Sequence, residues 1–302
     1  MKKYITITIT IFFFAVFASG ECYEPKGKKS KAKYDLAICA LFQNEANYMK
    51  EWIEFHKLAG VQHFYLYNDQ SEDDYMTVLK PYIDSGVVDL FECAKKKDNS
   101  LDEFSDMQSN TYMDCIKKFK NQVKWIAFID LDEFLFPTQQ KDLKVFLKSY
   151  DKYPAVAVNW QMFGTSGVEQ IPEGKLMIET LVNQAVEGFE KNHWVKLIVQ
   201  PKQVKKCHNA HLFYFRKKQR PVNSAYSPVK SFVSDTVFVN DIRINHYYTR
   251  DNHHLVTVKT PRRLQLSSSY QAWLDEVNQM NEVFSDAIFP YIPELQKKMG
   301  FK

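Results

Sequence analysis

Three carboxylates lie within four positions of one long apolar segment. In WIAFIDLDEFLFP, residues 125–137, the large side chains of a strand buried on both faces are followed by Asp130, Asp132 and Glu133. Asp130 and Asp132 are two positions apart, so in an extended segment they point to the same side. Two hard oxygen donors on one side suit Mn²⁺ or Mg²⁺, which share their remaining positions with water and substrate phosphates. The pair predicts a metal site; the alternative is a strand end whose acids cap the next turn and face water.

The elements that must position these acids alternate between strands and helices. Apolar runs predict strands over residues 35–42, 63–67 and 87–92, and apolar residues at helical spacing predict helices over about 45–59, 75–84 and 104–119. Asn44 is expected to cap the first helix and Gly60 to end it. Alternation with short connections is typical of a parallel sheet covered on both faces, and ligands bind outside the carboxyl ends of such strands. We therefore expect the acids at the edge of a cleft.

The pattern is less regular after Pro137. It predicts a helix over 143–150, strands over 155–160, 196–199, 211–216 and 242–248, and a C-terminal helix over 270–284 that ends the fold. With 302 residues, of which 45% are hydrophobic, the chain can form one large α/β domain or two small ones. It contains no GxGxxG or GxxxxGK[ST] sequence, so a glycine-rich phosphate loop is not expected.

The first 33 residues carry targeting and linker signals. Two lysines precede an apolar segment, residues 5–18, and a small-residue cleavage pattern, which predicts a signal peptide over residues 1–20, with an uncleaved membrane anchor as the alternative. Residues 21–33 are a basic linker to the folded domain, residues 34–302. We expect the domain to be exported or membrane-anchored, in a secreted, periplasmic or Golgi-type location. In that setting a disulfide such as Cys93–Cys115 could form, although spacing alone does not pair the cysteines.

Charge argues against nucleic acid as a partner. The net charge of +4 comes from the lysines of the first 33 residues, and the folded domain is close to neutral. A nucleic-acid binder normally carries its basic surface within the domain.

A further acid and a group of cations complete the candidate site. Asp69 follows the second strand, where a nucleotide-sugar site would use a carboxylate to accept hydrogen bonds from base or ribose; an ordinary Asx turn is the alternative. In a diphosphate site, Lys and Arg neutralise phosphate oxygens and a His completes the metal shell. The alternative for each is a structural or solvated residue. The group comprises Lys196, His211, His246, Arg250, Lys259, Arg262 and Arg263.

Aromatic residues beside a glycine suggest an acceptor platform. Trp160 and Phe163 precede Gly164 in NWQMFGTSG, and aromatic faces of this kind can stack on a sugar, although most aromatics belong to the core.

Several long segments in the same order resemble glycosyltransferase family 92. They are CALFQNEANYMKEWIEFHKLAGVQHFYLYNDQSEDD, VLKPYIDSGVVDL, WIAFIDLDEFLFP, NWQMFGTSG, VKLIVQP and RINHYYTR, and they extend from about residue 34 to 264. The resemblance implies a GT-A fold, an α/β domain with a Rossmann-like mixed sheet flanked by helices. It also implies a nucleotide-sugar donor, of UDP type, a divalent cation, inversion at the anomeric carbon, and a glycan acceptor, as in β-1,4-galactosyltransferases.

The resemblance also assigns residues. Asp130 and Asp132 match the family's metal motif, and we expect His246 to complete the metal shell. Lys196, His246 and Lys259 match later signature positions. We expect the donor to be bound by Glu45, Asp69, Lys196, Arg250, Lys259 and Arg263. This chain has Asp251 where Ser is expected in the family, which would alter local phosphate or acceptor contacts.

Inversion needs a base that deprotonates the acceptor hydroxyl during the attack. Glu169, Glu179 and Glu190 are candidates by position, with Glu169 preferred because it follows the FGTSG loop. Two other functions remain open: a metal-dependent phosphodiesterase or nucleotidyltransferase, and a non-catalytic glycan-binding module. The first would require more acids at strand ends to hold two ions, and the second would tolerate the loss of Asp130 or Asp132.

Overall fold

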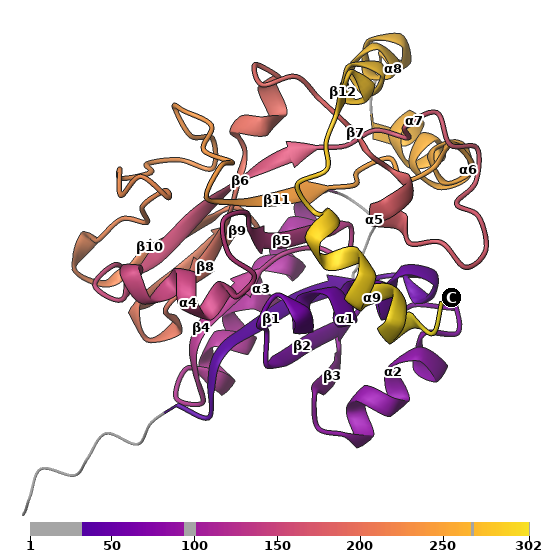
Figure 1. Cartoon of the computed structure of the whole chain (residues 1–302). Coiled ribbons are helices and arrows are strands. Elements are labelled where there is room, and N and C mark those ends of the chain that lie inside the picture. Colours follow the sequence, from indigo (N-terminus) through magenta and orange to yellow (C-terminus); the bar gives the residue numbers. More distant parts are fainter. Residues whose placement is uncertain (1–31, 94–100, 267–268, 302) are drawn as a thin grey trace, which may run out of the picture. The chain divides into compact units, whose positions relative to one another are not determined.

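The computed structural model describes residues 32–93, 101–266 and 269–301, and residues 32–302 form one compact unit (Figure 1). The predicted signal segment and most of the basic linker lie outside the described residues. Within the described ranges, no helix combines the length and the apolar character that a membrane crossing requires.

The first half of the chain forms four parallel strands. They are β1 (Tyr34–Phe42), β2 (His63–Asn68), β3 (Val88–Glu92) and β4 (Val123–Phe128), in the spatial order β3-β2-β1-β4. Alternate residues of β1 from Leu36 to Phe42 belong to two different core clusters, which explains why this part of the strand is apolar without interruption. The carboxyl ends of β1, β2 and β4 therefore meet at one edge of the sheet.

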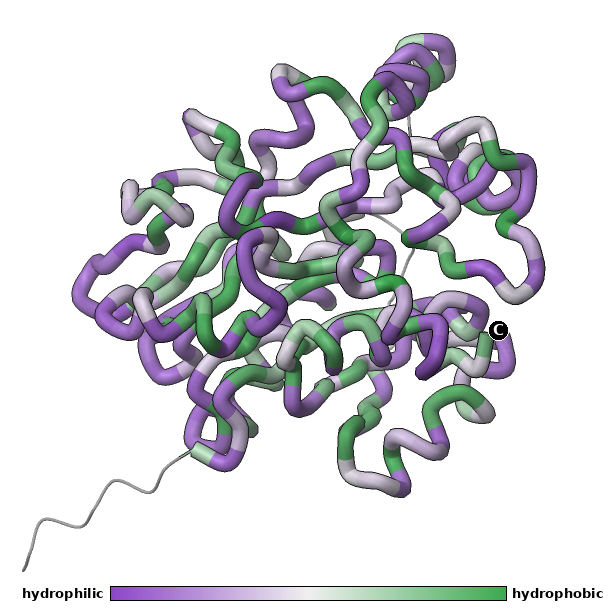
Figure 2. The backbone as a smooth tube through the Cα atoms, in the orientation of Figure 1, coloured by the Kyte–Doolittle hydropathy of each residue, from purple (hydrophilic) through white to green (hydrophobic). Residues whose placement is uncertain are grey.

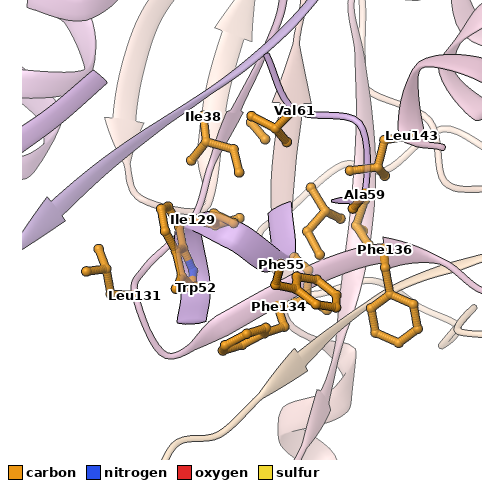
Figure 3. Packing of buried hydrophobic residues seen from close by; sticks show 14 of the residues in the cluster. Ile38, Trp52, Phe55, Ala59, Val61, Ile129, Leu131, Phe134, Phe136 and Leu143 are labelled. Carbon is orange, nitrogen blue, oxygen red and sulfur yellow. The ribbon is translucent and has the colours of Figure 1, made fainter. Parts of the chain in front are cut away.

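Three helices cover this half-sheet. α1 (Ala46–Leu58) and α2 (Tyr75–Asp84) pack on one face, and α3 (Leu101–Phe119) packs on the other. Figure 3 shows Trp52 and Phe55 of α1 among aliphatic and aromatic side chains from the sheet. Gly60, which follows α1, has a φ of +99°, a conformation that favours glycine. Asn44 does not cap α1, contrary to the prediction; its side chain accepts a hydrogen bond from the backbone of Glu72 instead.

The second half extends the sheet to eight strands and makes it mixed. β8 (Val195–Val199) runs antiparallel to β4 and to β6 (Ala155–Met162). β11 (Ile242–His246) then pairs parallel to β6 and antiparallel to β5 (Glu133–Pro137). The expected α/β fold with a mixed sheet flanked by helices is confirmed, and Figure 2 shows hydrophobic residues concentrated along its central strands.

The shorter elements surround this sheet. They are α4 (Leu143–Leu147), α5 (Met177–Thr180), β7 (Asn183–Gln184), β9 (Val204–Asn209), β10 (Leu212–Phe215), α6 (Asn252–His254), α7 (Thr260–Leu266), α8 (Tyr270–Asn278), β12 (Val283–Phe284) and α9 (Ile292–Met299). The prediction that the fold ends with a helix over 270–284 is wrong. α8 is shorter, and the chain continues into α9, which packs against α1 (Figure 1).

The segment 125–137 is also divided differently from the prediction. It contains the end of β4 and all of β5, with Asp130 and Asp132 in the connection between them. Cys39, Cys115 and Cys207 are free thiols, so the Cys93–Cys115 disulfide does not form.

Candidate functional site

The connection between β4 and β5 holds the two aspartates at the edge of the sheet. The backbone N–H of Asp130 donates to Oε2 of Glu133 at 3.0 Å, and the N–H of Glu133 donates to the carbonyl of Asp130 at 3.1 Å. The N–H of Tyr247, just after β11, donates to the carbonyl of Asp132 at 2.8 Å. The turn is thus fixed by its own hydrogen bonds and by a neighbouring strand, and both aspartates line one cavity of about 360 Å³.

A buried lysine pairs with the first aspartate. The ammonium of Lys196, which is 1% exposed, lies 2.7 Å from Oδ2 of Asp130 and 3.6 Å from Oε1 of Glu133. Burial alone would lower the pKa of Lys196, but Asp130 and Glu133 together raise it. Burial raises the pKa of Glu133 well above its ordinary value despite the nearby ammonium. Lys196 is therefore charged, and Asp130 is its ionic partner.

The second aspartate has two partners. Lys259 Nζ lies 3.0 Å from Oδ2 of Asp132, and His246 Nε2 lies 3.5 Å from Oδ1. Burial acts to raise the pKa of Asp132, but Lys259, His246 and Arg250 together hold it well below its usual range. Burial lowers the pKa of His246 more than Asp132 raises it, so the imidazole is neutral near pH 7. Asp132 is consequently a permanent negative charge beside a neutral ring nitrogen.

These groups have the donor chemistry for a divalent cation. Asp130, Asp132 and His246 line the same cavity and offer carboxylate oxygens and a neutral imidazole, ligands that Mn²⁺ accepts. In the part of the chain that the structure describes, no three His, Cys, Asp or Glu side chains are close enough to enclose an ion as they stand. The ammonium groups of Lys196 and Lys259 lie on the carboxylates instead, so a bound ion would replace at least one of them.

A second ion pair supports the rim of the cavity. Glu45, immediately before α1, lines the cavity and pairs with the guanidinium of Arg250, which is 1% exposed and lies 3.8 Å from the ring centroid of Tyr48. Arg250 has a positive φ of 54°, a backbone conformation that non-glycine residues adopt at some cost in energy. Burial raises the pKa of Glu45 although Arg250 opposes this shift. Arg250 acts here through Glu45 and is not itself part of the cavity wall.

Asp69 and the cations of the second half complete the wall. Asp69, at the end of β2, is 3% exposed and faces the cavity, and its carbonyl accepts from Gln43 Nε2 at 2.9 Å. Lys259 Nζ lies 4.6 Å from the ring centroid of Tyr248, which also lines the cavity. The expected cluster of an Asp after β2, an Asp pair after β4 and late cations is therefore present at one edge of the sheet.

Other predicted residues lie elsewhere. The exposed Glu169 accepts a 3.4 Å bond from Asn252, and neither it nor Glu179 or Glu190 belongs to the described wall of the cavity. Arg263 is also absent from that wall, where its neighbour Arg262 takes part and donates to Gln43 at 3.1 Å. Glu169 as a base and Arg263 as a donor ligand stay predictions that this geometry does not support.

The three residues predicted to bind the acceptor have packing roles here. Phe163 is 1% exposed and lies against Tyr247, with 4.8 Å between ring centroids. A Cβ on Gly164 would come within 2.3 Å of the side chain of Asn281, so only glycine fits this position without a shift. Trp160 is 7% exposed and packs behind His246 with a centroid distance of 4.5 Å, so it supports a residue of the site without lining the cavity.

Some wall residues were not predicted from the sequence. Gln43, Phe104, Gln108 and Tyr248 line the cavity. The position of Gln43 directly after β1 is the one signal that could have identified it, because the carboxyl ends of β1, β2 and β4 meet there.

Asp251 has a structural role that a serine could fill only in part. Its Oδ1 accepts from the backbone N–H of His254 at 2.8 Å, and its Oδ2 accepts from the N–H of Ile171 at 2.9 Å. The carboxylate thus caps α6 and also fixes the loop before α5.

Comparisons with known proteins identify relatives of this chain. The sequence profile of glycosyltransferase family 92 matches residues 34–299. A family 92 protein from Ricinus communis is 26% identical over 150 residues, which cover 48% of this chain and 26% of that protein. A galactan β-1,4-galactosyltransferase from Arabidopsis thaliana is 28% identical over 135 residues, which cover 42% of this chain and 26% of that protein. The chain thus spans about a quarter of the length of these relatives.

Solved structures show only a distant likeness. The S. aureus TarS fragment 1–349 in complex with UDP-GlcNAc has a TM-score of 0.36 and 11% identity, covering 56% of this chain and 46% of that one. Glucosyl-3-phosphoglycerate synthase from Mycobacterium tuberculosis, solved with Mn²⁺ and UDP, has a TM-score of 0.31 and 10% identity, covering 57% and 58%. The family profile covers nearly the whole folded unit, and it confirms the resemblance found in the sequence: the chain belongs to glycosyltransferase family 92.

Proposed function

We propose that this chain is a metal-dependent glycosyltransferase that moves a hexose such as galactose from a UDP-sugar to a hydroxyl of a glycan, with inversion. The observation that carries the proposal is that Asp130, Asp132, His246 and Lys259 line one cavity together with Asp69. A diphosphate needs cations close to its oxygens, and a divalent cation needs carboxylates. This cavity offers both kinds of group within one wall.

The family match supports the reaction class, and two relatives support the choice of sugar. Two Arabidopsis thaliana proteins named galactan β-1,4-galactosyltransferases match this chain at 28% and 24% identity. Because the matched segments cover only about a quarter of those proteins, the galactosyl donor and the galactan-like acceptor are proposals for this chain.

Different residues of the cavity would bind the cation and the phosphates of the donor. Asp130, Asp132 and His246 would hold the cation, which when bound stabilises the charge that develops on the leaving diphosphate. Lys259 and Arg262 face the same space, and their cationic groups can donate to phosphate oxygens once Asp132 is engaged by the cation. Lys196 holds Asp130 in place, because its buried ammonium lies close to both Asp130 and Glu133.

The nucleoside would lie toward the ends of β1 and β2. Glu45 and Asp69 face the cavity there, and carboxylates accept hydrogen bonds from ribose hydroxyls and base N–H groups. Arg250 holds Glu45 by an ion pair, and the ring of Tyr48 packs on the guanidinium of Arg250, so the carboxylate is fixed before the donor arrives.

The location of the protein is also part of the proposal. The sequence of residues 1–20 has the pattern of a signal peptide or anchor. We infer that the domain works where donor is supplied outside the cytosol, secreted or held at a membrane by its N-terminus.

A donor panel tests the function directly. The full chain is incubated with UDP- and GDP-sugars and β-1,4-linked galacto-oligosaccharides, with Mn²⁺, with Mg²⁺ or with EDTA, and products are followed by mass spectrometry. We expect extension of the acceptor from one UDP-hexose, loss of activity with EDTA, and loss of at least 100-fold in Asp132→Asn, because the cation would lose a charged ligand.

Asp151→Asn is the matched control. Asp151 lies outside the wall of the cavity, and its carboxylate forms an exposed ion pair with Lys124 at an N–O distance of 2.7 Å. Transfer that resists EDTA and the Asp132→Asn substitution would refute the cation mechanism. Release of a nucleoside monophosphate from the donor without transfer of the sugar would favour a phosphodiesterase.

A further inference from the structure

A second cavity, of about 570 Å³, lies beside β11, next to the segments 184–187 and 237–241. Arg243 forms part of its wall, whereas His246, three residues later on the same strand, lines the cavity of the aspartates. Side chains alternate along a strand, so Arg243 and His246 point to opposite faces of the sheet. Among the described residues, the two cavities have no wall residue in common. The second cavity is therefore a separate site of a size typical for small ligands, roughly 300–1,000 Å³.

Arg243 is buried without an ionic partner. It is 6% exposed, its Nη2 donates to Oγ of Ser285 at 2.9 Å, and its Nε has no hydrogen-bond partner. Its guanidinium lies 5.6 Å from the ring centroid of Phe136 on the paired strand β5. No carboxylate forms an ion pair with it in the part of the chain that the structure covers. A buried cation with an unused donor is costly, and a ligand that supplies acceptors would offset that cost.

The cavity also contains an unused acceptor. Oε1 of Gln184, from β7, is buried and has no partner, while Nε2 of Gln161 is already engaged with the carbonyl of Ala185 at 2.9 Å. The wall further includes the exposed carboxylates of Glu187 and Asp241. A fitting ligand must therefore both accept from Arg243 and donate to amide and carboxylate oxygens.

The charge of the wall decides between ligand classes. An anion could accept from Arg243, but the carboxylates of Glu187 and Asp241 in the same wall would repel it. Hydroxyl groups donate and accept at once, so a neutral sugar can satisfy all four groups. The apolar side chains of Val237, Phe238 and Val283 in the same wall suit the C–H faces of a sugar ring.

We propose that this cavity binds a neutral saccharide unit, with Arg243 donating to sugar oxygens and Gln184 accepting from a hydroxyl. The proposal deepens the proposed function and rests on it in one respect: the saccharide belongs to the glycan acceptor. The site holds the acceptor chain at a distance from the aspartate cavity, on the other face of the sheet.

Calorimetric titration of the full chain tests the site in the absence of donor and cation. The probes are β-1,4-galactotetraose, cellotetraose and mannotetraose as neutral chains, and tetragalacturonate as an anionic chain of equal length. We expect at least one neutral tetraose to bind with a millimolar Kd and tetragalacturonate to bind at least 10-fold more weakly. Arg243→Gln, Gln184→Leu and Val283→Trp should each weaken binding of the neutral chain at least 10-fold.

Val283→Trp and Gln184→Leu keep the test decisive if Arg243→Gln does not fold, because Val283 is 39% exposed and Gln184 lies in a short peripheral strand. Val145→Trp, at a 48% exposed position on α4, is the control and should bind as the wild type does. The site is refuted if no neutral tetraose binds, if tetragalacturonate binds more tightly, or if the three variants bind as the wild type. Because no transfer is measured, a chain without transferase activity can still bind, so failure of the proposed function gives a different result.

Discussion

Lys259 places its ammonium 3.0 Å from Oδ2 of Asp132, a residue 127 positions earlier in the chain. The contact joins the segment after α6 to the connection between β4 and β5. It also puts a monovalent cation on a carboxylate that the proposed mechanism assigns to a divalent one. In the proposed mechanism, Lys259 and the cation would therefore compete for Asp132, and the competition would end when a diphosphate offers the ammonium another partner.

Lys259→Met separates these two roles. Without nucleotide, we expect the variant to bind Mn²⁺ about 10-fold more tightly than the wild type, because the competing ammonium is gone. We expect it to bind UDP about 10-fold more weakly, since a hydrogen bond from a charged donor is worth about 1.5–3 kcal/mol. Mn²⁺ binding can be followed by electron paramagnetic resonance and UDP binding by calorimetry.

The control for this experiment is Lys124→Met, which removes an exposed lysine paired with Asp151. It should leave both affinities unchanged. Weaker Mn²⁺ binding in Lys259→Met would mean that Lys259 supports the cation site and does not compete with it.

The sequence was most informative where apolar periodicity and strand ends coincide. β1, β2 and β4 are mostly apolar, so the sequence locates their carboxyl ends and the residues Asp69, Asp130 and Asp132 that follow β2 and β4. Lys196 was predicted as one of the later cations and matches a signature position of the family, Glu45 was predicted as a donor ligand, and both residues lie at the site. Periodicity by itself would not have found them.

The predictions that this geometry does not support have a common physical cause. Phe163 and Gly164 follow a strand, as cleft residues often do, but the chain there turns inward against Tyr247 and Asn281. Whether an aromatic residue faces a cavity or the core depends on contacts with distant segments, which no local pattern records. The same applies to α9, whose position against α1 depends on residues almost 250 positions away.

Arg250→Lys should destabilise the fold by about 2–4 kcal/mol. Lysine lacks the planar guanidinium that contacts Glu45 and stacks on Tyr48, so it leaves a half-buried carboxylate poorly paired. Urea unfolding monitored by tryptophan fluorescence measures this change. Arg216→Lys, at an exposed position, is the control and should shift the free energy of unfolding by less than about 0.5 kcal/mol. A loss no larger than that of the control would show that the Arg250–Glu45 pair contributes little to stability.

Asp251→Ser tests the residue that departs from the family pattern. The serine hydroxyl can cap α6 by accepting from His254 but cannot also reach the N–H of Ile171, so one partly buried donor loses its partner. We expect a loss of about 1–2 kcal/mol in thermal or urea unfolding, and a smaller loss for Asp251→Asn, which keeps the shape and one oxygen acceptor. Equal stabilities of the serine variant and the wild type would contradict the bridging role of the carboxylate.

Glu51 predicts a specific pH dependence of stability. Its carboxylate, on α1, accepts from the backbone N–H groups of Met177 and Ile178 at 2.9 and 3.1 Å, and burial raises its pKa to about 7. Between the ordinary value of 4.5 and about 7, the folded protein holds a proton that the unfolded chain has released. The stability due to this proton is complete below pH 4.5 and is lost as the pH rises to about 7, a change of roughly 3 kcal/mol.

Glu51→Gln removes this titration while keeping one acceptor oxygen for the two N–H groups. The difference in unfolding free energy between variant and wild type should therefore shift in favour of the variant by roughly 3 kcal/mol as the pH rises from 4.5 to 7, measured by urea unfolding at several pH values. Variant and wild type must be compared because His56 also titrates. Burial lowers the pKa of His56 to about 3, so this residue makes the stability rise with pH over the same range. Both chains contain His56, and its effect cancels in the difference. Glu173→Gln, at an exposed position, should give a curve parallel to that of the wild type. If the Glu51→Gln curve is parallel as well, the buried carboxyl does not take up a proton near neutral pH, and its two backbone hydrogen bonds hold it ionised.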